Sequence, residues 1–124
     1  MVVNHQISGA FGGTGIDSGR HVTARSDGLI TIAGLFNSQP AKFGGTSVNS
    51  NGDFDPFVVD IDGSTGAVTN VRSLGGTNRD EAHGVASTAE TLVFAGSFGI
   101  SIDVLNQTFT SMGGLDGYVV RLKR

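Results

Sequence analysis

Acidic side chains are the groups of this sequence best suited to hold a ligand, because their oxygens suit metal ions and hydrogen-bond donors. Asp17 and Asp80 occupy the same place after two similar turns, Phe11-Gly12-Gly13-Thr14 and Leu74-Gly75-Gly76-Thr77. An Asp in this place also accepts backbone N–H groups and so fixes a turn. Because positions shared between repeats mostly serve the shared fold, we expect the structural role for both, with ligand binding as the alternative.

A second acidic group suggests calcium, which prefers oxygen ligands. Its members are Asp53, Asp55, Asp60 and Asp62. The segment from Asp60 to Ser64 begins like a calcium-binding loop but lacks the third acidic ligand and the terminal Glu. The matching segment later in the chain, Arg121-Leu122-Lys123, is basic. We therefore expect no cofactor, with Ca²⁺ as the alternative.

The remaining reactive residues show no catalytic spacing. His5, His21 and His83 share no close spacing and have no cysteine beside them, so only folding could unite them in a zinc site or a catalytic pair. No Gly-x-Ser-x-Gly motif is present. The sequence therefore predicts a protein that is not an enzyme.

Two irregular segments, 37–53 and 99–114, are expected to be loops, which often carry function on rigid scaffolds. Their aromatic and amide side chains are of the kind that stack on sugars and hydrogen-bond to them. The residues concerned are Phe43, Asn49, Asn51, Phe98, Asn106 and Phe109. We favour packing of the Phe rings between repeat units, and keep glycan binding as the alternative.

Composition excludes several classes of protein. The 124 residues fit one domain, since domains commonly hold about 100–200 residues. A net charge of −3 with 15% charged residues argues against nucleic acid as a partner. The basic end, Arg121, Lys123 and Arg124, is expected to be solvated. No apolar run suits a membrane span or a signal peptide, and there is no cysteine, so the localisation stays open.

An internal repeat is the strongest architectural signal. Three pairs recur at a constant spacing of 63: Phe11 with Leu74, Asp17 with Asp80, and Val22 with Val85. The segment 32–36 similarly returns at 94–98, and 52–61 returns at 113–122. The sequence thus predicts one repeat domain over residues 1–124, with repeat 1 at about 11–73 and repeat 2 at about 74–124.

Short apolar alternations between turn residues predict an all-β fold. In repeat 1 we call the expected strands A to D, at 21–26, 29–35, 56–62 and 67–73. In repeat 2, strands A to C are expected at 84–87, 92–97 and 118–123. Each repeat could also hold one short extra strand, at 41–43 in repeat 1 and at 102–105 in repeat 2. Asp27-Gly28 predicts a two-residue hairpin turn between the first two strands. Repeat 2 has no strand D after it, and residues 1–10 would supply that strand, which gives the chain order D-A-B-C-D-A-B-C.

These motifs together resemble the SBBP-type β-propeller repeat, over about residues 8–124. The resemblance lies in the Phe-Gly-Gly-Thr turn with Asp17, the Asp27-Gly28 turn, the strand that ends in Ala33-Gly34, and the Asp55-Pro56-Phe57-Val58-Val59 strand before Asp62-Gly63. The chain departs from the family in lacking a Trp in strand D and in having Ala89-Glu90-Thr91 at the second turn. The family is common in bacterial surface and secreted proteins, which is the localisation that the resemblance suggests.

The resemblance implies two four-stranded propeller blades, and two blades cannot close a ring, since propellers typically hold about 4–8. We expect a non-enzymatic scaffold whose copies assemble into a closed ring, three copies giving six blades and four giving eight. The N-terminal strand of one copy would complete the last blade of its neighbour. Residues expected at this strand exchange are Val2, Val3 and Ile7 on one side and Tyr118, Val120 and Leu122 on the other. A lectin-like propeller and an excerpt of a longer propeller are the alternatives.

Overall fold

The computed structural model describes residues 7–124, and this part of the chain is built from β-strands without a helix. A four-stranded sheet has the order β1-β2-β5-β6, and each neighbouring pair is antiparallel. Its strands are β1 (Asp17–Ala24), β2 (Leu29–Phe36), β5 (Asp55–Asp62) and β6 (Val68–Ser73). We call it the first sheet. The predicted all-β fold and the four strands of repeat 1 are confirmed, although β1 begins earlier than expected.

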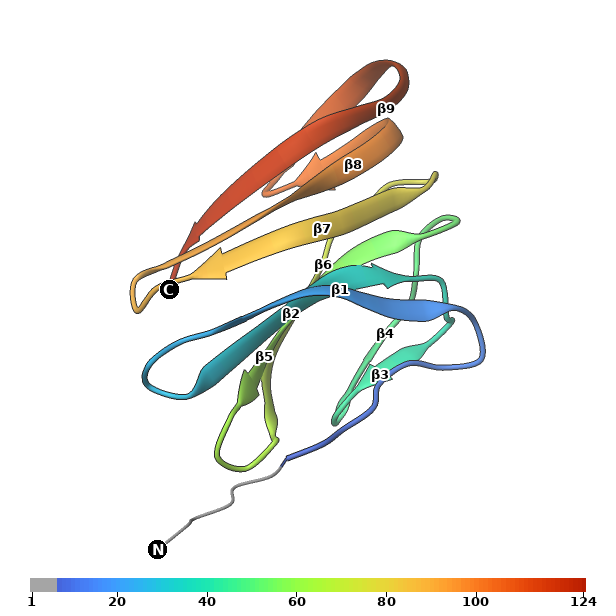
Figure 1. Cartoon of the computed structure of the whole chain (residues 1–124). Helices are drawn as coiled ribbons and strands as arrows, with labels where there is room; N and C mark the ends of the chain where they lie inside the picture. The colour runs from blue at the N-terminus through green and yellow to red at the C-terminus, as the bar shows by residue number, and fades with distance from the viewer. Residues whose placement is uncertain (1–6) are drawn as a thin grey trace, which may run out of the picture.

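The second sheet has three antiparallel strands in the order β7-β8-β9. They are β7 (Asp80–Ser87), β8 (Thr91–Val104) and β9 (Gln107–Lys123). Figure 1 shows this sheet lying over the first one, with β7 nearest to it. No fourth strand lies beside β9 among the described residues.

The expected loop at 99–114 is wrong, because this segment continues β8 and β9 as one long hairpin. Two backbone features explain the difference. Ile100 lies at a bulge with a φ of 58°, and the hairpin turns at Leu105 and Asn106, with φ of 49° and 66°. Two residues with positive φ form the turn that suits the twist of a hairpin. Asn106 was the only local signal for it, since Asn tolerates this conformation better than most residues.

In repeat 1 the matching segment instead folds into a separate small hairpin, β3 (Ala41–Phe43) and β4 (Thr46–Val48). The short strand predicted at 41–43 is therefore confirmed. Its Phe43 ring lies 4.9 Å from that of Phe57 and 5.6 Å from that of Phe11, measured between centroids. The hairpin thus helps to cover one face of the first sheet.

The turn between β1 and β2 is longer than predicted. The N–H of Gly28 donates to the carbonyl oxygen of Arg25 at 3.0 Å, and the N–H of Arg25 donates to Leu29 at 2.8 Å. Only Gly28 has a positive φ, at 95°. This is a three-residue loop closed by a glycine bulge rather than a two-residue turn.

One glycine of each repeat is required by the close approach of two strands. A Cβ at Gly34 would fall on the carbonyl oxygen of Ser18, and one at Gly96 on that of Glu81. These are equivalent positions on β2 and β8, which explains why the Ala-Gly pair recurs. The predicted N-terminal strand falls mostly on residues 1–6, outside the described residues, while Ile7 and Ser8 lie in no strand.

Candidate functional site

The two sheets pack face to face, and we call this contact the joint. From the first sheet, Ala33 and Val58 enter the joint and are 0% and 1% exposed. From the second sheet, Val85, Leu92 and Phe94 pack in the same core. Because side chains alternate along a strand, each sheet has an inner face toward the joint and an outer face away from it.

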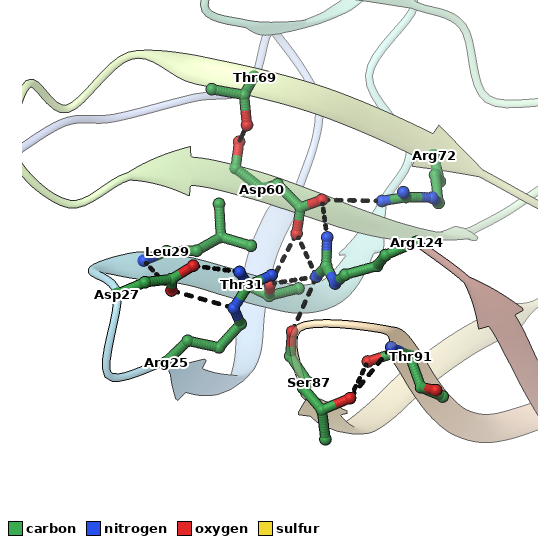
Figure 2. A network of polar contacts seen from close by, with 11 residues as sticks. Arg25, Asp27, Leu29, Thr31, Asp60, Thr69, Arg72, Ser87, Thr91 and Arg124 are labelled. Carbon is green, nitrogen blue, oxygen red and sulfur yellow. Dashed lines mark hydrogen bonds and ion pairs between the residues drawn. The ribbon is translucent and has the colours of Figure 1, made fainter.

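A buried ion-pair network closes the joint (Figure 2). The Arg124 guanidinium donates hydrogen bonds to both carboxylate oxygens of Asp60, at 2.9 and 3.0 Å. It also donates to the hydroxyls of Thr31 at 3.2 Å and Ser87 at 2.9 Å. Arg72 on β6 donates to Asp60 Oδ2 at 3.1 Å. The network therefore ties the last residue of the chain to the inner face of the first sheet.

Asp60 is an anion fixed by these donors. Burial by itself raises the pKa of Asp60, but hydrogen bonds from Arg124, Thr31 and Arg72 outweigh that effect and lower the pKa to about 2. The expected solvated basic end is wrong for Arg124, whose side chain is only 12% exposed. The pairing of Arg124 with Asp60 was not predicted from the sequence. The repeat places Arg121 at the position of Asp60, but this difference becomes informative only once the inner and outer faces of the sheets are known.

A second contact fastens the rim of the joint. The Asp80 N–H donates to the Phe54 carbonyl oxygen at 2.8 Å, and Phe54 forms a parallel bridge with Arg79. The Arg79 guanidinium lies 4.8 Å above the centre of the Phe54 ring, within range of a cation–π contact. The two repeats thus meet here through Phe54 of repeat 1 and Arg79 and Asp80 of repeat 2.

On the outer faces, two repeat positions that the joint buries are exposed. Val22 on the first sheet is equivalent to Val85, yet it is 59% exposed against 6% for Val85. Val119 on the second sheet is equivalent to Val58, yet it is 71% exposed against 1%. Each outer face therefore resembles one half of the joint.

The rim contact also has an uncovered counterpart. Ile16 is equivalent to Arg79 and Leu115 to Phe54, and these two side chains are 62% and 60% exposed. Ile16 lies just before β1 and Leu115 lies on β9. Ile16 and Leu115 thus lie on opposite outer faces of the described structure. In a contact between two chains they could meet as Arg79 and Phe54 do in the joint, although both are apolar.

The aspartates after the repeat turns hold those turns in shape. Four of them accept the backbone N–H of the residue four positions earlier: Asp17 from Gly13 at 2.8 Å, Asp55 from Asn51 at 2.5 Å, Asp80 from Gly76 at 2.6 Å, and Asp116 from Met112 at 2.9 Å. Asp17 also accepts a bond from the Ser38 hydroxyl at 2.7 Å. This is the structural role expected for Asp17 and Asp80.

Asp55 and Asp80 bring two carboxyl groups into the joint, each 0% exposed. Burial raises the pKa of Asp55 to about 6, and the negative charge of Asp80 adds to this effect, against the N–H of Asn51. Burial also raises the pKa of Asp80. Among the described residues, Asp55 Oδ1 has no hydrogen-bond partner. The joint therefore contains a carboxyl group that changes charge near pH 6.

His21 and His83 have different partners. His21 Nδ1 accepts the N–H of Val85 at 3.4 Å across the joint, whereas His83 Nε2 lies 3.1 Å from Glu81. His5 lies outside the described residues. Within residues 7–124, no three His, Asp or Glu side chains gather closely enough to hold a metal ion.

The acidic residues of the expected calcium loop have other partners. Asp60 faces its arginines, while Asp62 Oδ1 accepts the N–H of Ser64 at 2.8 Å and its hydroxyl at 2.7 Å. Asp62 thus caps the turn between β5 and β6. These two carboxylates point into different contacts.

The residues suggested for glycan binding lie apart. Phe43 and Phe98 are 1% and 4% exposed, and they belong to two different cores. Asn49 and Asn51 are exposed near the β3–β4 hairpin, and Asn106 is at the tip of the β8–β9 hairpin. Binding of a glycan by this set stays a prediction.

The residues expected at a strand exchange divide into three groups. Val2 and Val3 lie outside the described residues, and Ile7 is 37% exposed. Tyr118, Val120 and Leu122 lie on β9, with their side chains in the core of the joint. What β9 leaves free is therefore its backbone edge, not these side chains.

Comparisons with protein-family models, curated proteins and solved structures found no match to this chain. The described residues contain no helix that could span a membrane.

Proposed function

We propose that this chain is a β-propeller repeat module that serves as a non-enzymatic scaffold by joining copies of itself head to tail. One observation carries the proposal: repeat positions that are buried in the joint are exposed on the two outer faces. Val119 lies on one outer face and Val22 on the other, and their equivalents Val58 and Val85 are both within the joint. A second copy would bring to each outer face the repeat positions that form the other half of the joint.

The proposed contact is heterologous, because the outer face of the second sheet would meet the outer face of the first sheet of the next copy. Such contacts build a ring when the rotation between copies closes, and a filament when it does not. In a ring of three or four copies, the joints would alternate between those within chains and those between chains. The first and second sheets would then act as propeller blades.

Burial of apolar surface is the driving force that the proposal invokes. Val22, Val119, Ile16 and Leu115 would leave water together, and burying such a side chain fully contributes about 1.5–3 kcal/mol. The rim would be joined by Ile16 against Leu115, in place of the contact between Arg79 and Phe54. The scaffold role also agrees with the use of the turn aspartates as backbone acceptors.

Sedimentation equilibrium of charge variants tests the proposal. Val119→Asp and Val22→Asp should each convert assemblies to single chains, because an unpaired carboxylate in an apolar contact opposes association. Leu105→Asp is the matched control, since Leu105 is 62% exposed at the hairpin tip, away from the joint. Equal assembly by all three variants would refute the proposed faces.

A further inference from the structure

The free edge of β9 has a covered counterpart in the first sheet. There, β5 pairs with β2 on one side and with β6 on the other. In the second sheet, β9 pairs with β8 alone, and its other edge has no strand beside it among the described residues. Exposed strand edges present unpaired N–H and C=O groups to a further strand.

The repeat spacing identifies a segment that matches β6. Phe11 and Leu74 are 63 positions apart, and the same spacing relates residues 7–10 to residues 70–73 of β6. Residues 7–10 are exposed and form no strand in the structure of the single chain. Leu74, directly after β6, donates its N–H to the carbonyl of Pro56 at 3.3 Å, so the chain leaves β6 beside β5.

We propose that residues 7–10 of one copy add to β9 of the copy before it, as an antiparallel strand in one defined register. This inference rests on the head-to-tail assembly proposed above. The register is taken from β5 and β6, where Val58 lies opposite Arg72 and Phe57 opposite Ser73. Transferred by the repeat, it places Gly9 opposite Val119 and Ala10 opposite Tyr118.

Charges at this second contact support a copy of the same chain as the occupant. In the joint, Asp60 pairs with Arg72 and Arg124. Repeat 2 has Arg121 at the position of Asp60. In the contact between chains, Arg121 would repel arginines at the positions equivalent to Arg72 and Arg124. Those positions, obtained by the repeat spacing, are Gly9 and Gly63, and neither carries a charge. Compared with the joint, the contact between chains would thus have Arg121 in place of Asp60, and uncharged glycines in place of Arg72 and Arg124.

The paired positions Gly9 and Val119 are suited to a cysteine cross-link. A Cβ at Gly9 would have nothing within 4 Å, and Val119 is 71% exposed. Both positions therefore tolerate substitution in the single chain. Opposite residues of an antiparallel pair have Cα atoms about 4.5–5.5 Å apart. A disulfide spans about 4.4–6.8 Å between Cα atoms, so cysteines at these positions would bond across the contact.

The test is oxidation of mixed single-cysteine variants, which is unambiguous because the natural chain has no cysteine. Gly9→Cys is mixed with Val119→Cys, and Ile7→Cys with Val119→Cys is the control shifted by two residues. The proposed register predicts a covalent two-chain product from the first mixture and little from the second. The reverse preference, or equal yields, would overturn the register.

Native mass spectrometry of the same mixtures separates this inference from the proposed function. Assemblies that form without the Gly9–Val119 cross-link would overturn the register and leave head-to-tail assembly standing. Single chains in both mixtures and in the unmodified protein would overturn both. The cross-link within assemblies supports both.

Discussion

Replacement of Arg124 by Ala should weaken the fold far more than the position of this residue at the C-terminus suggests. The substitution removes four hydrogen bonds, two of them to Asp60 (Figure 2). Removing one partner of a buried ion pair costs about 3–5 kcal/mol. Arg72 and Thr31 would still donate to Asp60, so we expect a loss of about 2–3 kcal/mol in the free energy of unfolding.

Urea unfolding at one fixed protein concentration is the assay, because association also affects stability. With a slope of about 1–3 kcal/mol per molar urea, the midpoint should fall by about 0.7–3 M at an unchanged slope. Lys123→Ala is the control, since Lys123 is exposed and ends β9 directly before Arg124. A midpoint for Arg124→Ala equal to that of Lys123→Ala would refute the role of the network.

The pH dependence of the same loss gives an independent check. The pKa of Asp60 is lowered in the folded state from its ordinary value of 3.8 to about 2. Its contribution to stability is therefore present above about pH 4 and is lost as the pH falls toward 2. The difference between natural protein and Arg124→Ala should shrink over that range. A difference that stays constant down to pH 2 would contradict the assigned ion pair.

Two further substitutions test the joint and the sheets. The pKa of Asp55 is raised to about 6, so its contribution to stability is present below about pH 4 and is lost as the pH rises through 6. Asp55→Asn should thus stabilise the fold at pH 7.5, by up to about 3 kcal/mol, and leave it little changed at pH 4; thermal melts with the same pH slope in both proteins would contradict this. Gly96→Ala should lower the free energy of unfolding by about 1–3 kcal/mol, since its Cβ would fall on the Glu81 carbonyl oxygen. Gly84→Ala is the control, because a Cβ there meets nothing within 4 Å and should change the stability little. Equal urea midpoints for the two variants would refute the close approach.

Much of the strand order could be predicted from sequence, because turn residues and apolar alternation are local signals. The run from Leu29 to Ala33 and the turn at Gly63–Gly66 located β2, β5 and β6. The β8–β9 hairpin could not be predicted in the same way, because its turn at Leu105 and Asn106 lacks the usual glycine. The length of this hairpin depends on the pairing of β8 with β9, which local sequence does not specify.

The candidate site was less accessible to sequence reasoning. The structural role of Asp17 and Asp80 could be inferred because it depends on a backbone N–H only four positions away. The partners of Asp60 could not, since Arg124 is 64 positions from it along the chain. A like-for-like comparison of repeat positions, such as Asp60 with Arg121, becomes informative only once the inner and outer faces are known.

The mass of the unmodified chain in solution tests the central claim most directly. Head-to-tail joining predicts, by native mass spectrometry at micromolar concentration, one closed species whose mass is a whole multiple of the 12.7 kDa chain, with three or four copies. That species should dissociate when Val119 is replaced by Asp. A folded single chain of 12.7 kDa as the sole species at that concentration would contradict the account.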